Sequence, residues 1–299
     1  MESRRTWKSS SFAAMGLALT VLAACDKTKK DPDPPLDTGA PNIIAEDGTD
    51  TAATEIDAEL ITGSLVAGGS VDGLRLANTE VAGSAIGTRD VGDGAKALYF
   101  PRGCLDAIND PTSSTVTYTF KTVPGALNRG CQGPNGLLHV IGEVKARYRT
   151  DGRKLVLDLV GTNLQVNRAT IDWNAHAEIT ADGADRTMVW KAQLSGETGR
   201  KRAFSRTNEK VVKWRLGERC FGVEGVSTGD VSKRSLRTEI TGFRRCAGAC
   251  PENGGKIIVT DLTKDKRVEL SFDGTRFATY TGPNGQTSQV DMFCSGTDN

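Results

Sequence analysis

The sequence predicts an all-β fold, an antiparallel meander of about ten strands that is stapled by disulfides. Three observations lead to this prediction: runs of alternating apolar and polar residues, Asp-Gly and Asn-Gly dipeptides between the runs, and an even number of cysteines after residue 25. The pattern leaves open whether the strands close into a barrel, form a sandwich or remain an open curved sheet.

The alternation becomes regular after Cys104. Apolar residues at every second position lie on one face of a strand. The runs are Val116, Tyr118 and Phe120; Leu155, Leu157 and Leu159; Met188, Trp190, Ala192 and Leu194; Val212, Trp214 and Leu216; and Val268, Leu270 and Phe272. The dipeptides that predict tight hairpin turns are Asp151-Gly152, Asp182-Gly183, Asn253-Gly254, Asp273-Gly274 and Asn284-Gly285. No segment after the leader shows an apolar stripe typical of a packed helix, so an antiparallel sheet is favoured.

The chain begins with an export signal. Basic residues at positions 4, 5 and 8 precede an apolar run over residues 12–24, and Leu-Ala-Ala-Cys ends at Cys25. Thirteen apolar residues rise only ~20 Å as a helix, so a cleaved signal is favoured over a membrane anchor. The arrangement resembles a bacterial lipoprotein signal, which implies cleavage after Ala24 and acyl chains such as palmitate on Cys25. The choice between inner and outer membrane, and the side that the protein faces, stay open.

Four segments follow from composition. They are a signal peptide (1–24), a lipidated cysteine with a disordered acidic tether (25–59), a weakly patterned Gly- and Ala-rich segment (60–103) and the antiparallel β-domain (104–299). The tether carries three Lys against seven Asp and three Glu, whereas residues 60–299 have a net charge of +6. We expect a tether of this kind to contribute little to the stability of the domain.

Six cysteines remain once Cys25 is lipidated. An even number in an exported chain indicates three disulfides, and we pair them by proximity as Cys104 with Cys131, Cys220 with Cys246, and Cys250 with Cys294. A swap that joins Cys246 to Cys294 is the alternative. A zinc clip at Cys246 and Cys250 is disfavoured because other ligands are scarce, so we expect no metal and no cofactor.

Catalytic motifs are not evident in the sequence. The two histidines, His139 and His176, both fall inside predicted strands, where a hydrogen-bonded structural residue is the more common role. The sequence has no nucleophile elbow, phosphate-binding glycine loop or EF-hand. His176-Ala-Glu178 matches part of a zinc deaminase motif, but the accompanying cysteine pattern does not follow. A carboxylate pair for glycan hydrolysis is defined by its separation in space, so spacing along the chain does not show whether such a pair exists.

One basic cluster is a candidate anion-binding patch. Its residues are Arg200, Lys201, Arg202, Arg206, Lys210, Lys213 and Arg215. Lys213 and Arg215 would flank an inward-facing Trp214 and lie on the outer face. The patch would suit an anionic glycan or lipid, and the alternative is a solvated sheet face that resists edge-to-edge pairing. Nucleic acid is not an expected partner of a lipid-anchored exported chain, and the oligomeric state stays open.

The chain past Cys104 resembles a group of β-rich lipoproteins of Gram-negative cell envelopes. The resemblance depends on Cys131-Gln-Gly-Pro-Asn-Gly, on the stretch 167–173, and on Arg245-Cys-Ala-Gly-Ala-Cys-Pro with a final meander that ends in Cys294. It implies a shared fold and no particular activity. We therefore expect a lipid-anchored envelope protein without catalytic activity that has a binding or structural role. The alternatives are a lipid- or anionic-glycan-binding module and, third, a glycan-active enzyme.

Overall fold

Two helices and fourteen strands make up the described part of the chain. The structure, a computed structural model, describes residues 40–68, 88–124, 130–133, 139–151, 154–215, 218, 220–246 and 249–291. The helices are α1 (Ala40–Gly68) and α3 (Thr88–Leu98). The strands are β1 (Leu105–Asp110), β2 (Thr115–Phe120), β3 (Cys131–Gln132), β4 (His139–Asp151), β5 (Lys154–Val166), β6 (Ala169–Asp182), β7 (Asp185–Glu197), β8 (Ala203–Arg215), β9 (Cys220–Val231), β10 (Arg234–Cys246), β11 (Lys256–Asp261), β12 (Lys266–Phe272), β13 (Phe277–Thr281) and β14 (Thr287–Asp291).

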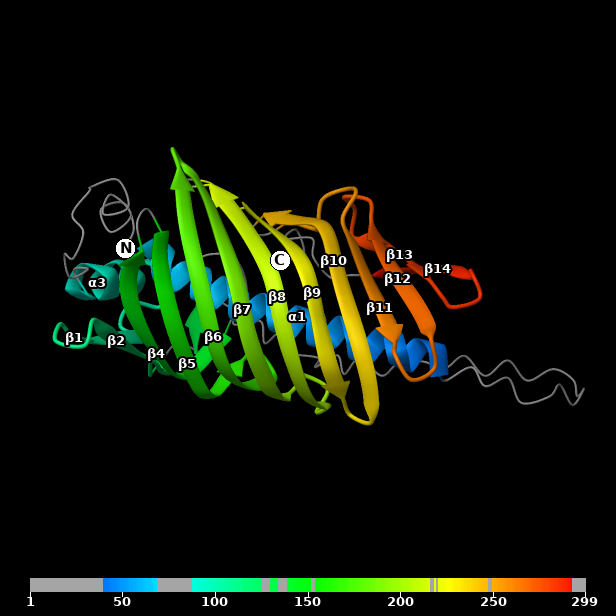
Figure 1. Cartoon of the computed structure of the whole chain (residues 1–299), viewed down its shortest axis with the longest axis horizontal. Helices are drawn as coiled ribbons and strands as arrows, with labels where there is room; N and C mark the ends of the chain where they lie inside the picture. The colour runs from blue at the N-terminus through cyan, green and yellow to red at the C-terminus, as the bar shows by residue number, and fades with distance from the viewer. Residues whose placement is uncertain are drawn as a thin grey trace, which may run out of the picture. The chain divides into compact units, whose positions relative to one another are not determined.

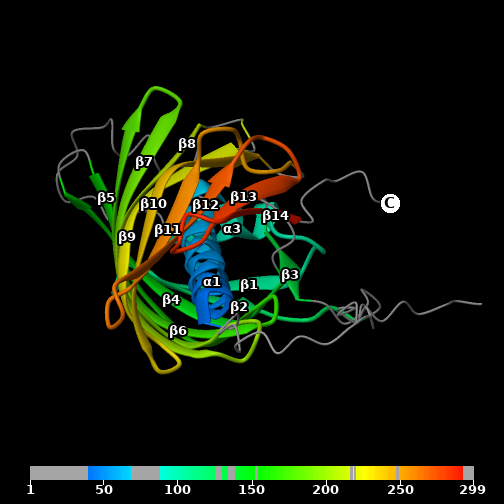
Figure 2. The same ribbon diagram turned by 90° about the vertical axis from the view of Figure 1, so that its right-hand side faces the viewer.

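The strands form one antiparallel sheet. Each strand pairs with the next in the order β1-β2-β4-β5 and onward to β14, and the short β3 pairs with β4. The sheet curves strongly but does not close, because β1 and β14 lie at its two ends without pairing to each other (Figures 1 and 2). The predicted antiparallel meander is therefore confirmed, as an open curved sheet with fourteen strands in place of about ten.

The predicted strand faces and turns agree with the structure. The apolar residues of the runs in β2, β5 and β7 are buried, including Tyr118, Leu157 and Trp190 at 0% exposure. Gly183 and Gly254 have positive φ angles of 56° and 96°, which glycine adopts at low cost in a tight turn. Leu216 and Gly152 lie outside the described residues.

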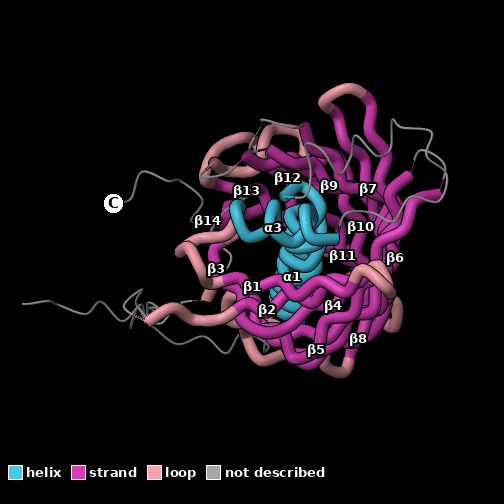
Figure 3. Tube along the Cα trace, turned by 90° about the vertical axis from the view of Figure 1, so that its left-hand side faces the viewer, coloured by secondary structure: helices cyan, strands magenta, loops and turns pink. Residues whose placement is uncertain are grey.

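Helix α1 lies across the concave face of the sheet. Figures 2 and 3 show the sheet curling around this helix, which occupies its interior. Its apolar side includes Ile44, Ile61 and Leu65, each no more than 1% exposed, and these side chains belong to the same core as the inward residues of the strands. The hydrophobic core of this protein therefore lies between α1 and the concave face of the sheet.

The position of α1 corrects the predicted domain boundaries. Residues 40–59 were expected within a disordered tether, and 60–103 as a weakly patterned segment, yet α1 spans both and α3 follows. Helix α1 belongs to the same compact unit as the sheet. The expectation of no packed helix is also wrong. Residues 1–39, with the predicted signal peptide and Cys25, lie outside the described residues.

The composition of α1 indicates that this helix depends on packing against the sheet. It contains Gly48 and Gly63, and several of its threonines donate hydroxyl hydrogen bonds back to carbonyls one turn earlier, as Thr51 does to Asp47 at 2.6 Å. A sequence of this kind has weak intrinsic helicity, so packing against the sheet stabilises the helix. At its other end Ser64 bonds to the hydroxyl of Tyr99, just after α3. Neither described helix is both long and apolar enough to cross a membrane.

Candidate functional site

The inward face of β8 carries polar side chains in a position where β5, β6 and β7 carry apolar ones. Arg206, Asn208 and Lys210 are each no more than 2% exposed and alternate with exposed residues along the strand. Their neighbours on the same concave face are Ser227 of β9 and Thr238 of β10, which are both 1% exposed. The middle of the concave face is therefore a basic, hydrogen-bonding strip.

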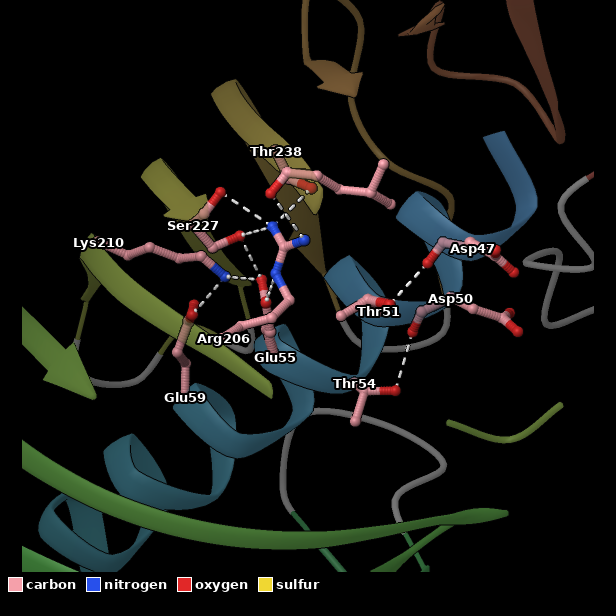
Figure 4. A network of polar contacts seen from close by, with 11 residues as sticks. Asp47, Asp50, Thr51, Thr54, Glu55, Glu59, Arg206, Lys210, Ser227 and Thr238 are labelled. Carbon is pink, nitrogen blue, oxygen red and sulfur yellow. Dashed lines mark hydrogen bonds and ion pairs between the residues drawn. The ribbon is translucent and has the colours of Figure 1, made fainter. Parts of the chain in front are cut away.

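Helix α1 places two glutamates against this strip (Figure 4). Glu55 and Glu59 are four residues apart, so they lie on one side of the helix. Glu55 pairs with the Arg206 Nε at 2.8 Å and with the Lys210 Nζ at 3.0 Å. Glu59 pairs with the same Lys210 Nζ at 2.8 Å, and the four side chains are fully buried. We call Glu55, Glu59, Arg206 and Lys210 the ionic lock.

Neutral groups complete the hydrogen bonds of the ionic lock. The Ser227 hydroxyl donates to Glu55 at 2.8 Å. One guanidinium nitrogen of Arg206 donates to the Ser227 carbonyl at 2.9 Å and to the Thr238 hydroxyl at 2.9 Å. Because buried charges are tolerated only when they are paired and hydrogen-bonded, these contacts keep the lock in its present arrangement.

A second set of ion pairs holds the beginning of α1. Asp47 is 2.8 Å from the Arg234 guanidinium and 3.4 Å from that of Arg202. Arg200 pairs with Glu46 at 2.8 Å and with Asp50 at 3.3 Å. Helix α1 contains six acidic residues and no basic one, so its charge is complementary to the arginines and lysine that surround it.

Burial and pairing shift the carboxyl pKa values in opposite directions. Burial raises the pKa of Glu59 to about 7, although Lys210 acts against this shift. Burial also acts on Glu55, but Lys210 and Arg206 together outweigh it and lower the pKa of that carboxyl. Burial likewise raises the pKa of Asp57, on another side of α1, to about 7 against its hydrogen bond from Asn167. Glu55 is thus the ionised member of the pair, and Glu59 titrates near neutrality.

Several buried polar atoms near the lock have no hydrogen-bond partner among the described residues. They are the second carboxylate oxygen of Glu59, the side-chain amide of Asn208 and the indole nitrogen of Trp190. Trp190 is the register partner of Lys210, and Asn208 lies two residues before it on the same face. Buried polar groups of this kind are commonly satisfied by ordered water.

The predicted anion-binding patch does not form one surface. Arg206 and Lys210 point inward and belong to the ionic lock, whereas Arg200 and Arg202 pair with the start of α1. Lys201 is exposed beside Glu197 at 3.6 Å. Lys213 and Arg215 lie on the outer face, 62% and 56% exposed, on either side of Trp214, which packs against the core. Strand alternation separates the members of this cluster, so the single patch is corrected.

The histidines lie in strands, as the sequence predicts. His139 begins β4, and His176 lies in β6 on the outer face, where its Nδ1 is 2.7 Å from the Asp158 carboxylate. Lys191 is its register partner on β7 and pairs with Glu209 of β8 at 3.0 Å. This row of alternating charges resembles the cross-strand pairs that stabilise solvated sheet faces.

Two of the predicted disulfides are present. Cys104 bonds to Cys131, and Cys220 bonds to Cys246. The second bond rules out both the alternative pairing of Cys246 with Cys294 and a zinc clip that uses the Cys246 thiolate. The pairing of Cys250 with Cys294 stays a prediction because Cys294 lies outside the described residues. Within the described ranges, no cluster of three or more His, Cys, Asp or Glu could hold a metal ion.

The residues that the sequence interpretation missed are the acidic partners on α1. Glu55 and Glu59 were assigned to a tether because the segment lacks large apolar residues. A signal was present, since acidic residues at helical spacing match basic residues at alternate positions of β8.

The fold and this site together define a curved antiparallel sheet wrapped around an acidic helix. No family model, curated protein or solved structure matches the chain.

Proposed function

We propose that this chain is a lipid-anchored protein of the bacterial cell envelope whose helix-filled sheet is a non-enzymatic binding or structural module. The sequence Leu-Ala-Ala-Cys at residues 22–25, behind a short apolar run, supports the lipid anchor. The acyl chains would be carried by Cys25, and two chains suffice for stable attachment. No transmembrane helix is needed for this mode of attachment.

The disulfides support an exported location. Cys104–Cys131 and Cys220–Cys246 are compatible with an oxidising compartment, since such bonds are rare in the reducing cytosol. Cys220 and Cys246 are register partners at the ends of β9 and β10, so their bond joins positions that the sheet already brings together. The two disulfides would stabilise the folded domain in an oxidising compartment outside the cytoplasm.

The observation that supports a binding or structural role is that helix α1 occupies the concave face of the sheet. Arg206 and Lys210 of β8 and Ser227 of β9 bond to glutamates of α1, and the apolar groups of β4–β7 pack in the same core. The titratable groups on this face pair with one another inside the fold. A structural or binding role follows more directly from this arrangement than a reaction at the concave face.

A lipid-binding module is the second candidate. The large apolar side chains that an acyl chain would contact on the concave face include Trp173 and Trp190, which are 3% and 0% exposed. An acyl chain would have to share or replace the position of α1. Native mass spectrometry of the detergent-extracted protein distinguishes the two candidates, because a co-purifying lipid favours this one and its absence favours the first.

Replacement of the lipidated residue tests the anchor. We expect Cys25→Ala to move the protein from the membrane fraction to the soluble fraction, because the thioether that carries the lipid would be absent. Fractionation and immunoblotting measure the distribution, and Cys250→Ala is the matched control that should stay with the membrane. A Cys25→Ala protein that remains in the membrane fraction would contradict the proposal.

A further inference from the structure

A groove of about 500 Å³ lies on the outer face of the sheet. It crosses β7, β8, β9 and β10, which are neighbouring strands (Figure 1), near the end that carries the Cys220–Cys246 disulfide. Sites for small ligands usually enclose roughly 300 to 1,000 Å³, so this groove is large enough to hold one.

A glycine forms part of the floor of the groove. Gly222 of β9 is the register partner of Lys213 on β8 and of Arg244 on β10, so it lies between two exposed basic side chains on the outer face. A Cβ at Gly222 would meet only the Phe243 carbonyl at 3.5 Å and the Lys213 carbonyl at 4.0 Å, so the backbone does not require glycine here. A glycine inside a strand often marks a place where a ligand approaches the backbone closely.

Three features hold the walls of the groove in place. The register of β10 against β9 shifts around Gly242, whose φ of 58° is a left-handed conformation that favours glycine, and bulges of this kind are common next to functional sites. The Cys220–Cys246 bond joins the ends of β9 and β10. At the beginning of β7 the buried Arg186 donates a hydrogen bond to the Asp185 carbonyl at 2.9 Å. A site with fixed walls loses little conformational entropy when a ligand binds.

Two ion pairs around the groove leave a gap between their partners. The Lys213 ammonium is 3.8 Å from the Glu224 carboxylate, and the Arg215 guanidinium is 3.9 Å from the Asp185 carboxylate. Direct hydrogen bonds from nitrogen to oxygen are shorter, at most roughly 3.2 Å. The side chains of Lys213 and Arg215 donate no hydrogen bond to any described residue. A hydroxyl group between such partners can accept a hydrogen bond from the cation and donate one to the carboxylate.

The charges of the groove balance one another. Its exposed cations and its exposed carboxylates are equal in number, and they are Lys213, Arg215 and Arg244 with Asp185, Glu218 and Glu224. The remaining cation, Arg186, is buried, and Arg244 also pairs with Glu252 at 3.1 Å. An anionic ligand would therefore meet carboxylates, and a cationic ligand would meet guanidinium groups. A neutral ligand with many hydroxyl groups can bond to both kinds of side chain.

We propose that this groove binds a neutral saccharide. The inference deepens the binding role proposed above, on which it rests. A sugar hydroxyl both donates and accepts hydrogen bonds, so hydroxyls in the two gaps would complete both ion pairs. Val211 and Gly222, which line the groove, provide nonpolar surface for the C–H groups of a sugar ring.

Isothermal titration calorimetry of the detergent-extracted protein tests the class of ligand. The neutral probes are maltotriose, cellotriose and tri-N-acetylchitotriose, and the anionic probe is trigalacturonate. We expect at least one neutral trisaccharide to bind at millimolar or lower concentration, and trigalacturonate to bind at least about tenfold more weakly. The proposal is overturned if no neutral probe binds at millimolar concentration, or if trigalacturonate binds as tightly as the best neutral probe.

Gly222→Leu tests the location of the site. The leucine side chain would fill the groove and should weaken saccharide binding at least about tenfold. Ser205→Leu, at an exposed position on the outer face of β8 but outside the groove, is the matched control and should leave binding unchanged. Circular dichroism shows whether each variant keeps the fold.

Removal of one carboxylate gives a second comparison that adds no bulk to the groove. Glu224→Ala should weaken saccharide binding, because the hydroxyl beside Lys213 would lose its acceptor. Glu209→Ala, which removes a carboxylate that is 70% exposed on β8 and outside the groove, should leave binding unchanged. Equal binding by the two variants of either comparison would overturn the groove as the site.

The proposed lipid anchor is tested separately, because membrane fractionation of Cys25→Ala does not depend on the groove. Loss of saccharide binding in a protein that stays with the membrane overturns this inference alone. A protein that binds saccharide at the groove but does not depend on Cys25 for membrane attachment contradicts the anchor and supports the groove.

Discussion

At the residue scale, Lys210 is the centre of the ionic lock. Its ammonium group lies within 3.0 Å of Glu55 and 2.8 Å of Glu59, and burial is complete for all three side chains. The inward position of Lys210 follows from strand alternation, but its partners lie more than 150 residues earlier in the chain. Alternation along β8 could therefore predict the burial of Lys210, but not the helix that pairs with it.

Removal of the Lys210 charge should be strongly destabilising. Lys210→Met leaves Glu59 without its cation in a dry interior, which costs about 3 to 5 kcal/mol in comparable cases. Urea unfolding followed by circular dichroism measures the free energy of unfolding. The control is Lys213→Met on the same strand, which is 62% exposed and should change it by no more than about 0.5 kcal/mol. Equal effects of the two substitutions would contradict the buried lock.

The raised pKa of Glu59 predicts a pH dependence. The carboxyl titrates near 4.5 when unfolded and at about 7 when folded, so the native state holds an extra proton between these values. The free energy of unfolding should fall as the pH rises from about 4.5 through 7, by up to roughly 3 kcal/mol for this group. Asp57 acts in the same direction, since burial raises its pKa to about 7 as well.

A substitution isolates the contribution of Glu59. Glu59→Gln keeps a polar group next to Lys210 but cannot ionise, so its unfolding free energy should differ less between pH 5.5 and pH 8 than that of the unmodified protein. Urea titrations at the two pH values measure this difference. If the variant shows the same pH dependence as the unmodified protein, the assignment to Glu59 is wrong.

At the element scale, α1 is the part that the sequence did not predict. Hydrophobic periodicity fails there because the side of the helix that faces β8–β10 is acidic and hydroxylic, with Glu55 and Thr51 both 0% exposed. The sequence predicts strands such as β2, β5 and β7 because each of them has one apolar face, as in β7 with Met188 and Trp190. The helix instead depends on charge complementarity with a distant strand, which local patterns do not contain.

Two deletions compare the contribution of helix α1 to stability with that of the segment before it. Removal of residues 40–59 should abolish cooperative unfolding or lower Tm by at least about 15 °C, because Arg206 and Lys210 would lose their partners. Removal of residues 26–37 should shift Tm by less than about 2 °C, as expected for a tether. Thermal unfolding followed by circular dichroism gives both values. An unchanged Tm after removal of 40–59 would show that α1 is dispensable.

At the scale of the whole molecule, the sequence predicts the class and connectivity of the fold but not its curvature or its interior. Antiparallel order follows from hairpin turns such as Asp182-Gly183, and two disulfides follow from proximity along the meander. The open curved form could not be predicted, since the curvature of a sheet of this kind depends on what packs against its concave face, here α1. The boundary of the folded unit depends on the same helix.

One measurement tests both the proposed lipid anchor and the disulfides of the folded unit. Intact mass spectrometry of the detergent-extracted protein, with and without thiol labelling under denaturing conditions, reports the amino terminus and the free cysteines together. We expect a chain that begins at an acylated Cys25, with six cysteines in three disulfides and no label incorporated. A chain that begins at Met1, or a mature chain that takes up two or more labels, would contradict the account of a disulfide-stapled, lipid-anchored envelope protein.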